Sequence, residues 1–116
     1  MASINYNNRV FRSVSNSDNG EVSSATTFHD HQDGNVVWAT YSGGAIRCGT
    51  LIATVENVSR LDMRYHQVNA RGELMTGHCR STPEVLPDGR IRLHERWQWT
   101  SGDASAGESA IEEVLP

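Results

Sequence analysis

The sequence predicts an all-β domain, an eight-stranded antiparallel up-and-down β-barrel. Short turn signals recur along the chain, and the segments between them alternate apolar and polar residues with a period of two. No stretch sustains the period of about 3.6 that is typical of a helix. The turn signals are dipeptides that supply the positive φ angles of tight hairpins. They are Asn19-Gly20, Asp33-Gly34, Gly43-Gly44 and Asp88-Gly89, with a further turn at 69–72.

The expected strands fit one domain that spans residues 1–116, because a chain of this length has room for a single hydrophobic core. Eight antiparallel strands with one apolar face must cover that face and protect their edges. A closed barrel does both, and a two-sheet β-sandwich is the alternative. The expected strands cover residues 8–14, 21–31, 35–42, 45–55, 60–68, 73–82, 90–100 and 108–114.

The fifth expected strand indicates which side chains face the interior. Leu61, Met63 and Tyr65 alternate with polar residues, so these three should point inward. Carrying the alternation through the hairpins extends the inward set to the other strands. Its further apolar members are Phe28, Val37, Ala39, Tyr41, Ile46, Ile52, Leu74, Ile91, Leu93, Trp97 and Trp99.

The same alternation places four ionisable side chains inside the barrel: Asp30, His78, Arg80 and Glu95. Buried charge is costly unless it is paired or offered to a ligand, so these residues favour a lined cavity. Arg80 could hold a carboxylate, and Glu95 with His78 could form an acid–base pair for catalysis. Alternatively, Arg80 and Glu95 form a purely structural ion pair. The expected ligand-binding residues are Arg80, Tyr41, Tyr65, Asp30, Trp97 and Trp99, the tryptophans as apolar walls.

Charge and composition narrow the classes of function. The net charge is −4, which argues against nucleic-acid binding because phosphate contacts need a basic surface. All basic residues are arginines, so the chain has no lysine for a Schiff base or a Walker-type phosphate loop. No apolar run approaches the ~20 residues that span a bilayer, and the first twenty residues lack the apolar core of a signal peptide. We therefore expect a cytoplasmic protein without membrane contact.

Three further patterns have plain interpretations. Cys48 and Cys79 should be free thiols, because two strands separate them by roughly 9–10 Å, more than a disulfide spans. His29 and His31 have a spacing that suits a metal, but both should face solvent, so no metal or cofactor is expected. The run 90–99 mixes basic and aromatic residues, yet alternation puts them on opposite faces, which indicates an amphipathic strand.

An apolar stripe on the outward face predicts a homodimer. Val36, Trp38, Leu51 and Ala53 should lie there, with Val55 continuing the stripe. Exposed apolar patches that hold a tryptophan usually mark an interface. The expected contact uses the strands at 35–42 and 45–55.

Two stretches, 13–46 and 86–103, resemble a family of small bacterial proteins that genomes often label N-acetylglutamate synthase. The likeness runs over nearly the whole chain. Acetyltransferases of the usual type cradle the pyrophosphate of acetyl-CoA in a glycine-rich loop followed by a helix, and this chain has no such unit. We therefore do not expect the synthase activity, although an acyl or amino-acid ligand stays open.

A looser likeness is to calycin-type barrels such as the lipocalins and avidins. Trp97, Thr100, Ser101 and Gly102 form a Trp-x-x-Thr-Ser-Gly sequence that is similar to a late strand of the avidins. The resemblance implies a barrel that binds a small molecule in its lumen, and a few calycin-type barrels catalyse lyase or isomerase steps there.

Three functions follow from these observations. The first is a small-molecule-binding barrel with a mixed aromatic and polar lumen. The second is a small enzyme of the lyase or isomerase type, with Glu95, His78 and Arg80 moving protons on a carboxylate-bearing substrate. The third is a protein-interaction module that works through its outer surface.

Overall fold

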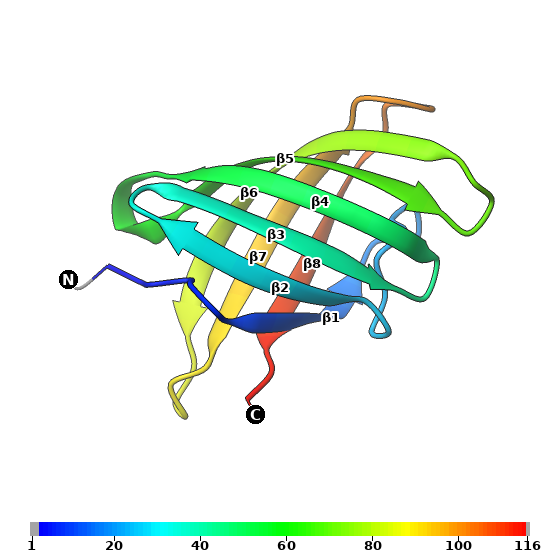
Figure 1. Cartoon of the computed structure of the whole chain (residues 1–116). Helices are drawn as coiled ribbons and strands as arrows, with labels where there is room; N and C mark the ends of the chain where they lie inside the picture. The colour runs from blue at the N-terminus through cyan, green and yellow to red at the C-terminus, as the bar shows by residue number, and fades with distance from the viewer. Residues whose placement is uncertain (1–2, 116) are drawn as a thin grey trace.

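Tight turns join eight successive strands into a closed antiparallel barrel (Figure 1). The computed structural model describes residues 3–115. Each strand pairs with the next, and β1 pairs with β8, so the sheet closes on itself. The strands are β1 (Val10–Asn16), β2 (Thr27–Asp33), β3 (Val36–Gly43), β4 (Ile46–Val55), β5 (Leu61–Asn69), β6 (Leu74–Val85), β7 (Ile91–Trp99) and β8 (Ala106–Glu113). This architecture confirms the predicted fold class.

Four of the five predicted turns contain a glycine with positive φ. The prediction for Asn19-Gly20 was wrong, because Gly20 has no positive φ and lies in the long connection between β1 and β2 instead of in a tight hairpin. Gly34, between β2 and β3, has a φ of +59°, a left-handed value that side chains other than glycine rarely adopt. Between β4 and β5 lies a short 3₁₀ turn, Asn57–Ser59. Among the described residues, no helix is both long and apolar enough to cross a membrane.

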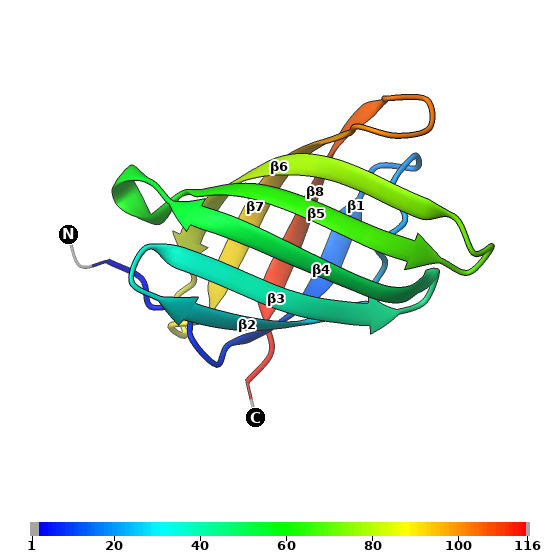
Figure 2. The same ribbon diagram turned by 45° about the horizontal axis from the view of Figure 1, so that its top comes forward.

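The N-terminal segment plugs one end of the barrel. The Tyr6 ring is fully buried, and its hydroxyl donates a 2.7 Å hydrogen bond to the Ser59 carbonyl. The backbone N–H groups of Ile4 and Tyr6 donate to Ser59 Oγ and Gln32 Oε1 at 2.9 and 2.7 Å. In Figure 2 this segment runs beside the end of β2, while the β1–β2 and β7–β8 loops lie together at the opposite end.

The predicted orientation of β4 was wrong for most of the strand. Leu51 and Ala53 are buried inside the barrel, whereas Ile52 faces outward with 57% of its surface exposed. The pairing of β4 with β5 shifts register between Ile46 and Cys48, so Ile46 points inward as predicted and the residues after the shift are inverted. A bulge adds one residue to a strand, and with a period of two this moves every later side chain to the other face.

The predicted orientation of β6 was also wrong. Leu74 pairs with Val68 on the outer face, where it is 65% exposed, and Cys79 pairs with Met63 inside. His78 and Arg80, which alternate with Cys79, therefore lie on the outer side. The prediction took the largest apolar residue as the inward one, but the interior side of β6 carries small residues that leave room for large rings from neighbouring strands.

Candidate functional site

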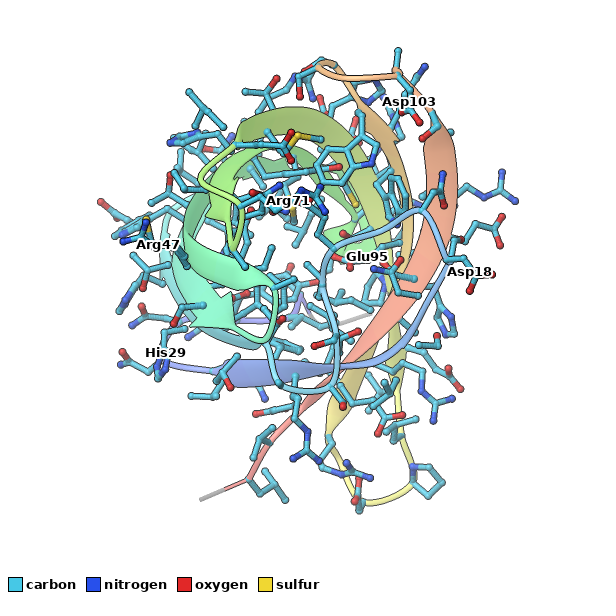
Figure 3. The ribbon with its side chains drawn as sticks, turned by 90° about the vertical axis from the view of Figure 1, so that its right-hand side faces the viewer. Asp18, His29, Arg47, Arg71, Glu95 and Asp103 are labelled. Carbon is cyan, nitrogen blue, oxygen red and sulfur yellow. The ribbon has the colours of Figure 1, made fainter. Side chains whose placement is uncertain are left out.

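The barrel contains a cavity beneath the β1–β2 loop. Figure 3 looks into the barrel from this end and shows Glu95 within the ring of strands, while His29 and Arg47 lie at the outer surface. The cavity volume is about 50 Å³. A buried water needs ~10–15 Å³ on this measure, so the space corresponds to a few water molecules. Its lining comprises Asn16, Gly20, Glu21, Val22, Phe28, Tyr41, Leu51, Met63, Tyr65, Gln67, Cys79, Glu95, Trp97, Trp99 and Ser109.

Aromatic rings form most of the apolar wall. The ring centres of Trp97 and Trp99 lie 5.5 Å apart, and Tyr65 meets Trp99 edge-on at 5.8 Å. Two glycines make room for these rings. A Cβ atom at Gly77 would overlap the Tyr65 ring, and one at Gly107 would overlap the Trp97 ring. Missing side chains on β6 and β8 thus let the rings lie close against the barrel wall.

Residues 17–26, which we name the lid, cover the cavity. The Trp97 indole N–H donates to Asn16 Oδ1 next to the lid, and the Trp99 indole N–H donates to the Asn19 carbonyl, both at 3.2 Å. Trp99 therefore satisfies its indole N–H through the lid, and Trp97 does so through Asn16, the last residue of β1. A ligand that displaced the lid would have to replace the Asn19 carbonyl as acceptor or leave the Trp99 indole unpaired.

Glu21 fixes the lid to the barrel rim. Its carboxylate accepts hydrogen bonds from Gln67 Nε2 at 2.9 Å and Asn69 Nδ2 at 2.7 Å. The prediction of a strand over 21–31 was wrong in its first half, because β2 begins at Thr27 and the preceding residues belong to the lid. The signal that could have been used is the cluster of serines at 23–24, which favours a loop over a strand.

Asp30 and Glu95 face the interior, as the alternation predicted, and Glu113 at the end of β8 is a further buried carboxyl, paired with Arg9 at 2.8 Å. Glu95 accepts hydrogen bonds from Ser109 Oγ at 3.0 Å and Ser81 Oγ at 3.3 Å. Burial raises the Glu95 pKa to about 7, and these two serines partly oppose the shift. Asp30 is only 5% exposed, and burial, with a further contribution from the Glu95 charge, raises its pKa to about 8. Near neutral pH Asp30 and Glu95 therefore retain protons that exposed carboxyls would have lost.

The described residues contribute no basic side chain to the cavity lining. The ionisable groups there are carboxyls, phenols and a thiol, namely Glu21, Tyr41, Tyr65, Cys79 and Glu95. Burial raises the pKa of both phenols and of the Cys79 thiol, so all three are neutral at physiological pH. The lumen thus combines aromatic walls with acidic groups alone.

The structure does not bring His78 and Arg80 into this site. Arg80 lies on the outer surface, where its Nη1 is 3.2 Å from Glu56 Oε1. The prediction that Arg80 lies in the lumen was therefore wrong, as were the alternative Arg80–Glu95 ion pair and the placement of Glu95 beside His78. The remaining expected binding residues, Tyr41, Tyr65, Asp30, Trp97 and Trp99, all lie on the interior side. Their role in binding stays a prediction.

Several polar residues of the cavity were missed by the sequence analysis. Gln67 continues the inward series of β5 and donates to Glu21, while its Oε1 accepts from the Tyr41 hydroxyl at 2.8 Å. Extending the inward series of β5 from Tyr65 by two residues would have predicted that Gln67 points inward. Ser109 had no comparable signal, because its orientation depends on the register of the last hairpin.

The remaining predictions concern cysteine and histidine. Cys48 and Cys79 are both free thiols, as predicted, the first exposed and the second buried. His29 is exposed on the outer face, and His31 stacks on Trp38 with ring centres 5.7 Å apart. Within residues 3–115, no group of three or more histidine, cysteine or acidic side chains is arranged to hold a metal.

A closed eight-stranded barrel with one plugged end and an aromatic cavity below a loop at the other defines a calycin-like, lumen-containing β-barrel. The chain belongs to the avidin-like family: the family model described as "Avidin-like protein" matches residues 4–114. None of the curated proteins compared with the chain matches it. The family match confirms the avidin-like resemblance and gives no support to the N-acetylglutamate synthase label.

Proposed function

We propose that this protein binds a small molecule in the barrel lumen, beneath the lid. The observation that carries the proposal is the cavity itself, lined by Tyr41, Tyr65, Trp97 and Trp99 together with a few polar groups such as Glu95. Small-molecule sites are typically concave and apolar, with a small number of polar groups that orient the ligand. Membership of the avidin-like family supports this function.

The size of the cavity implies that the lid moves. About 50 Å³ is too little for anything much larger than solvent, so a ligand must displace the lid or the rings beneath it. Hydrogen bonds from Trp99, Gln67 and Asn69 hold the lid over the cavity, and Ser17 and Asn19 fix it further to β8. A bound molecule with an acceptor group at its outer end would replace the partner that the Trp99 indole loses.

A second candidate function is proton transfer in the same lumen. The raised pKa values of Asp30 and Glu95, about 8 and about 7, suit groups that exchange protons near neutral pH. This candidate replaces the acid–base pair of Glu95 and His78, since His78 lies outside. Turnover of a bound ligand, lost in Asp30→Asn, would distinguish an enzyme from a binding protein.

A homodimer is the partner arrangement that the outer surface favours. Trp38 and Ile52 are neighbours on β3 and β4, with exposed fractions of 42% and 57%. Leu51 and Ala53, part of the expected interface, are buried in the lumen instead. The apolar stripe is therefore centred on Trp38 and Ile52, beside Val36.

The expected cytoplasmic location also stays a prediction.

The binding proposal can be tested by tryptophan fluorescence. The chain has three tryptophans, so Trp38→Phe leaves only Trp97 and Trp99, which both line the cavity. This variant is titrated with a panel of small amides, ureas, amines and carboxylic acids, biotin included. We expect a saturable change in emission with at least one compound, together with a higher melting temperature.

Two cysteine variants provide a matched control. Cys79→Leu fills the cavity, whereas Cys48→Leu makes the same change on the exposed face of β4. With circular dichroism verifying the fold of both, we expect binding to weaken at least tenfold in Cys79→Leu and to be unchanged in Cys48→Leu. Equal binding by both variants, or no response to any compound, would contradict the proposal.

A further inference from the structure

We propose that the lumen selects a small organic cation, whose ammonium group lies between the Glu95 carboxylate and the rings of Tyr65, Trp97 and Trp99. This inference rests on the proposed binding function and adds the charge of the ligand to it. It reverses the expectation that Arg80 would hold a carboxylate-bearing ligand.

The first argument is the charge of the lining. Every ionisable side chain that contacts the cavity is acidic or neutral, and Glu21 already accepts two hydrogen bonds from Gln67 and Asn69. Glu95 differs from Glu21 in having no basic partner among residues 3–115, whereas Glu21 Oε2 lies 3.7 Å from Arg71 Nη2. An ionised carboxylate has about four acceptor positions, and the two serine hydroxyls occupy two of them on Glu95. An ammonium group can use the rest as charge-assisted hydrogen bonds.

The second argument is Asp30, a carboxyl on the interior side of β2 just outside the cavity lining, which forms no ion pair with any basic side chain among residues 3–115. It faces the interior from β2, only 5% exposed, and none of the side-chain hydrogen bonds among residues 3–115 reaches its carboxyl oxygens. Its pKa responds to the charge of Glu95, so the two carboxyls share one electrostatic environment. A buried acid with no counter-charge is unfavourable, and a cation in the lumen would supply the missing charge.

The third argument is the aromatic wall. The ring centre of Trp99 lies 5.5 Å from that of Trp97 and 5.8 Å from that of Tyr65, and Tyr41 and Phe28, which also line the cavity, stack at 4.7 Å. The faces of aromatic rings attract cations, most strongly where water is excluded. A carboxylate in the same place would meet these negative ring faces and the acids, with no arginine or histidine of the lining to balance it.

Cation binding should be linked to the release of protons. The titratable groups that face Glu95 or Asp30 from the surrounding elements are Glu21 of the lid, Tyr6 of the N-terminal plug, Tyr41 on β3, Tyr65 on β5 and Cys79 on β6. The Arg9–Glu113 ion pair lies beside Tyr6 at the plugged end, and its two charges compensate each other. The phenols and the thiol stay neutral, so the two interior carboxyls must supply the compensating negative charge. Binding of a cation should therefore tighten as the pH rises from 6 to 8, whereas an anion would show the opposite dependence.

The experiment uses three probes of similar shape on the full chain: benzylamine, benzyl alcohol and benzoate. Affinities are measured by calorimetry at pH 7 in phosphate and in Tris buffers, whose protonation enthalpies differ. We expect benzylamine to bind at least tenfold more tightly than benzyl alcohol, with benzoate weaker still. We also expect the apparent enthalpy of benzylamine binding to depend on the buffer, which reports the released protons.

Two glutamine variants test whether the preference for a cation comes from Glu95 in the lumen or from carboxylates on the outer surface. Glu95→Gln should lose the preference for benzylamine over benzyl alcohol, and Glu108→Gln, an exposed position on β8, should keep it. If benzyl alcohol or benzoate binds as tightly as benzylamine, or benzylamine does not bind at millimolar concentration, the inference is overturned. Binding of benzyl alcohol that Cys79→Leu abolishes would leave the proposed function standing while refuting the cation.

Discussion

Burial, and not ion pairing, decides the charge of Asp30 and Glu95. Both pKa values are raised, to about 8 and about 7, mainly because the interior disfavours the ionised form. In the unfolded chain such carboxyls titrate near pH 4. Between about pH 4 and pH 8 the folded state therefore binds more protons than the unfolded state, and stability falls as the pH rises through this window.

Asp30→Asn should remove much of this pH dependence. At pH 8 the variant should be more stable than the parent by roughly 2–5 kcal/mol, since each unit of pKa shift corresponds to ~1.4 kcal/mol. At pH 4, where both carboxyls are protonated in the fold, the two proteins should differ little. Urea denaturation at several pH values measures this difference. Asp33→Asn, at the exposed end of β2, is the matched control and should change nothing. If Asp30→Asn is no more stable than the parent at pH 8, burial does not raise the pKa of Asp30 as described.

Glu95→Gln should cost little stability, because no buried arginine depends on Glu95. The glutamine carbonyl can accept one of the serine hydrogen bonds and its amide can donate to the other, so we expect a loss below about 1 kcal/mol at pH 6. Arg80→Ala, which removes an exposed ion pair with Glu56, should also cost less than about 1 kcal/mol. Chemical denaturation of both variants provides the measurement. A loss of ~3–5 kcal/mol for Glu95→Gln would indicate a buried ion pair after all.

At the scale of the strands, sequence alternation predicted β5 and β7 well, and it failed where a hairpin or bulge changed the register. Leu61 and Met63 on β5, with Leu93 and Trp97 on β7, are buried as expected, because each strand runs without interruption. β4 contains a bulge at Arg47 and Cys48, and neither residue is of a type that would have indicated it from the sequence.

The cavity could be predicted only in part, for the same reason. Glu95 and the two lumen tryptophans follow from the alternation of a single strand, while His78 and Arg80 depended on the 69–72 turn. The lid could not be predicted from local sequence. Its position is fixed by long-range hydrogen bonds, such as those from Trp99 to Asn19 and from Gln67 to Glu21.

Glu21→Gln should loosen the lid. Both oxygens of the Glu21 carboxylate accept hydrogen bonds, from the amide groups of Gln67 and Asn69. A glutamine replaces one of these oxygens with an NH2 group, which can only donate, so at least one of the two hydrogen bonds would be lost. We expect backbone amides of residues 17–26 to exchange hydrogen at least tenfold faster, with little change in global stability. Asp18→Asn, exposed in the same loop, is the control. Equal protection in the parent and in Glu21→Gln, measured by mass spectrometry, would show that this carboxylate does not hold the lid.

At the scale of the whole molecule, the outer face predicts the assembly. Light scattering at tens of micromolar should give a dimer for the parent protein and a monomer for Ile52→Asp, because the charge would be placed in the apolar stripe beside Trp38. Val85→Asp, 64% exposed at the far end of β6, should stay dimeric. A monomeric parent protein under these conditions would contradict the predicted interface.

The most direct test of the lumen as the binding site uses the three indole N–H signals in a nitrogen–proton correlation spectrum. Trp97 and Trp99 donate to Asn16 and Asn19 at the cavity, while Trp38 lies on the outer face. As a bound compound is titrated, the signals of Trp97 and Trp99 should shift saturably and that of Trp38 should stay in place. A binding curve reported by Trp38 alone, with the two lumen indoles unmoved, would place the ligand outside the barrel and contradict the central claim.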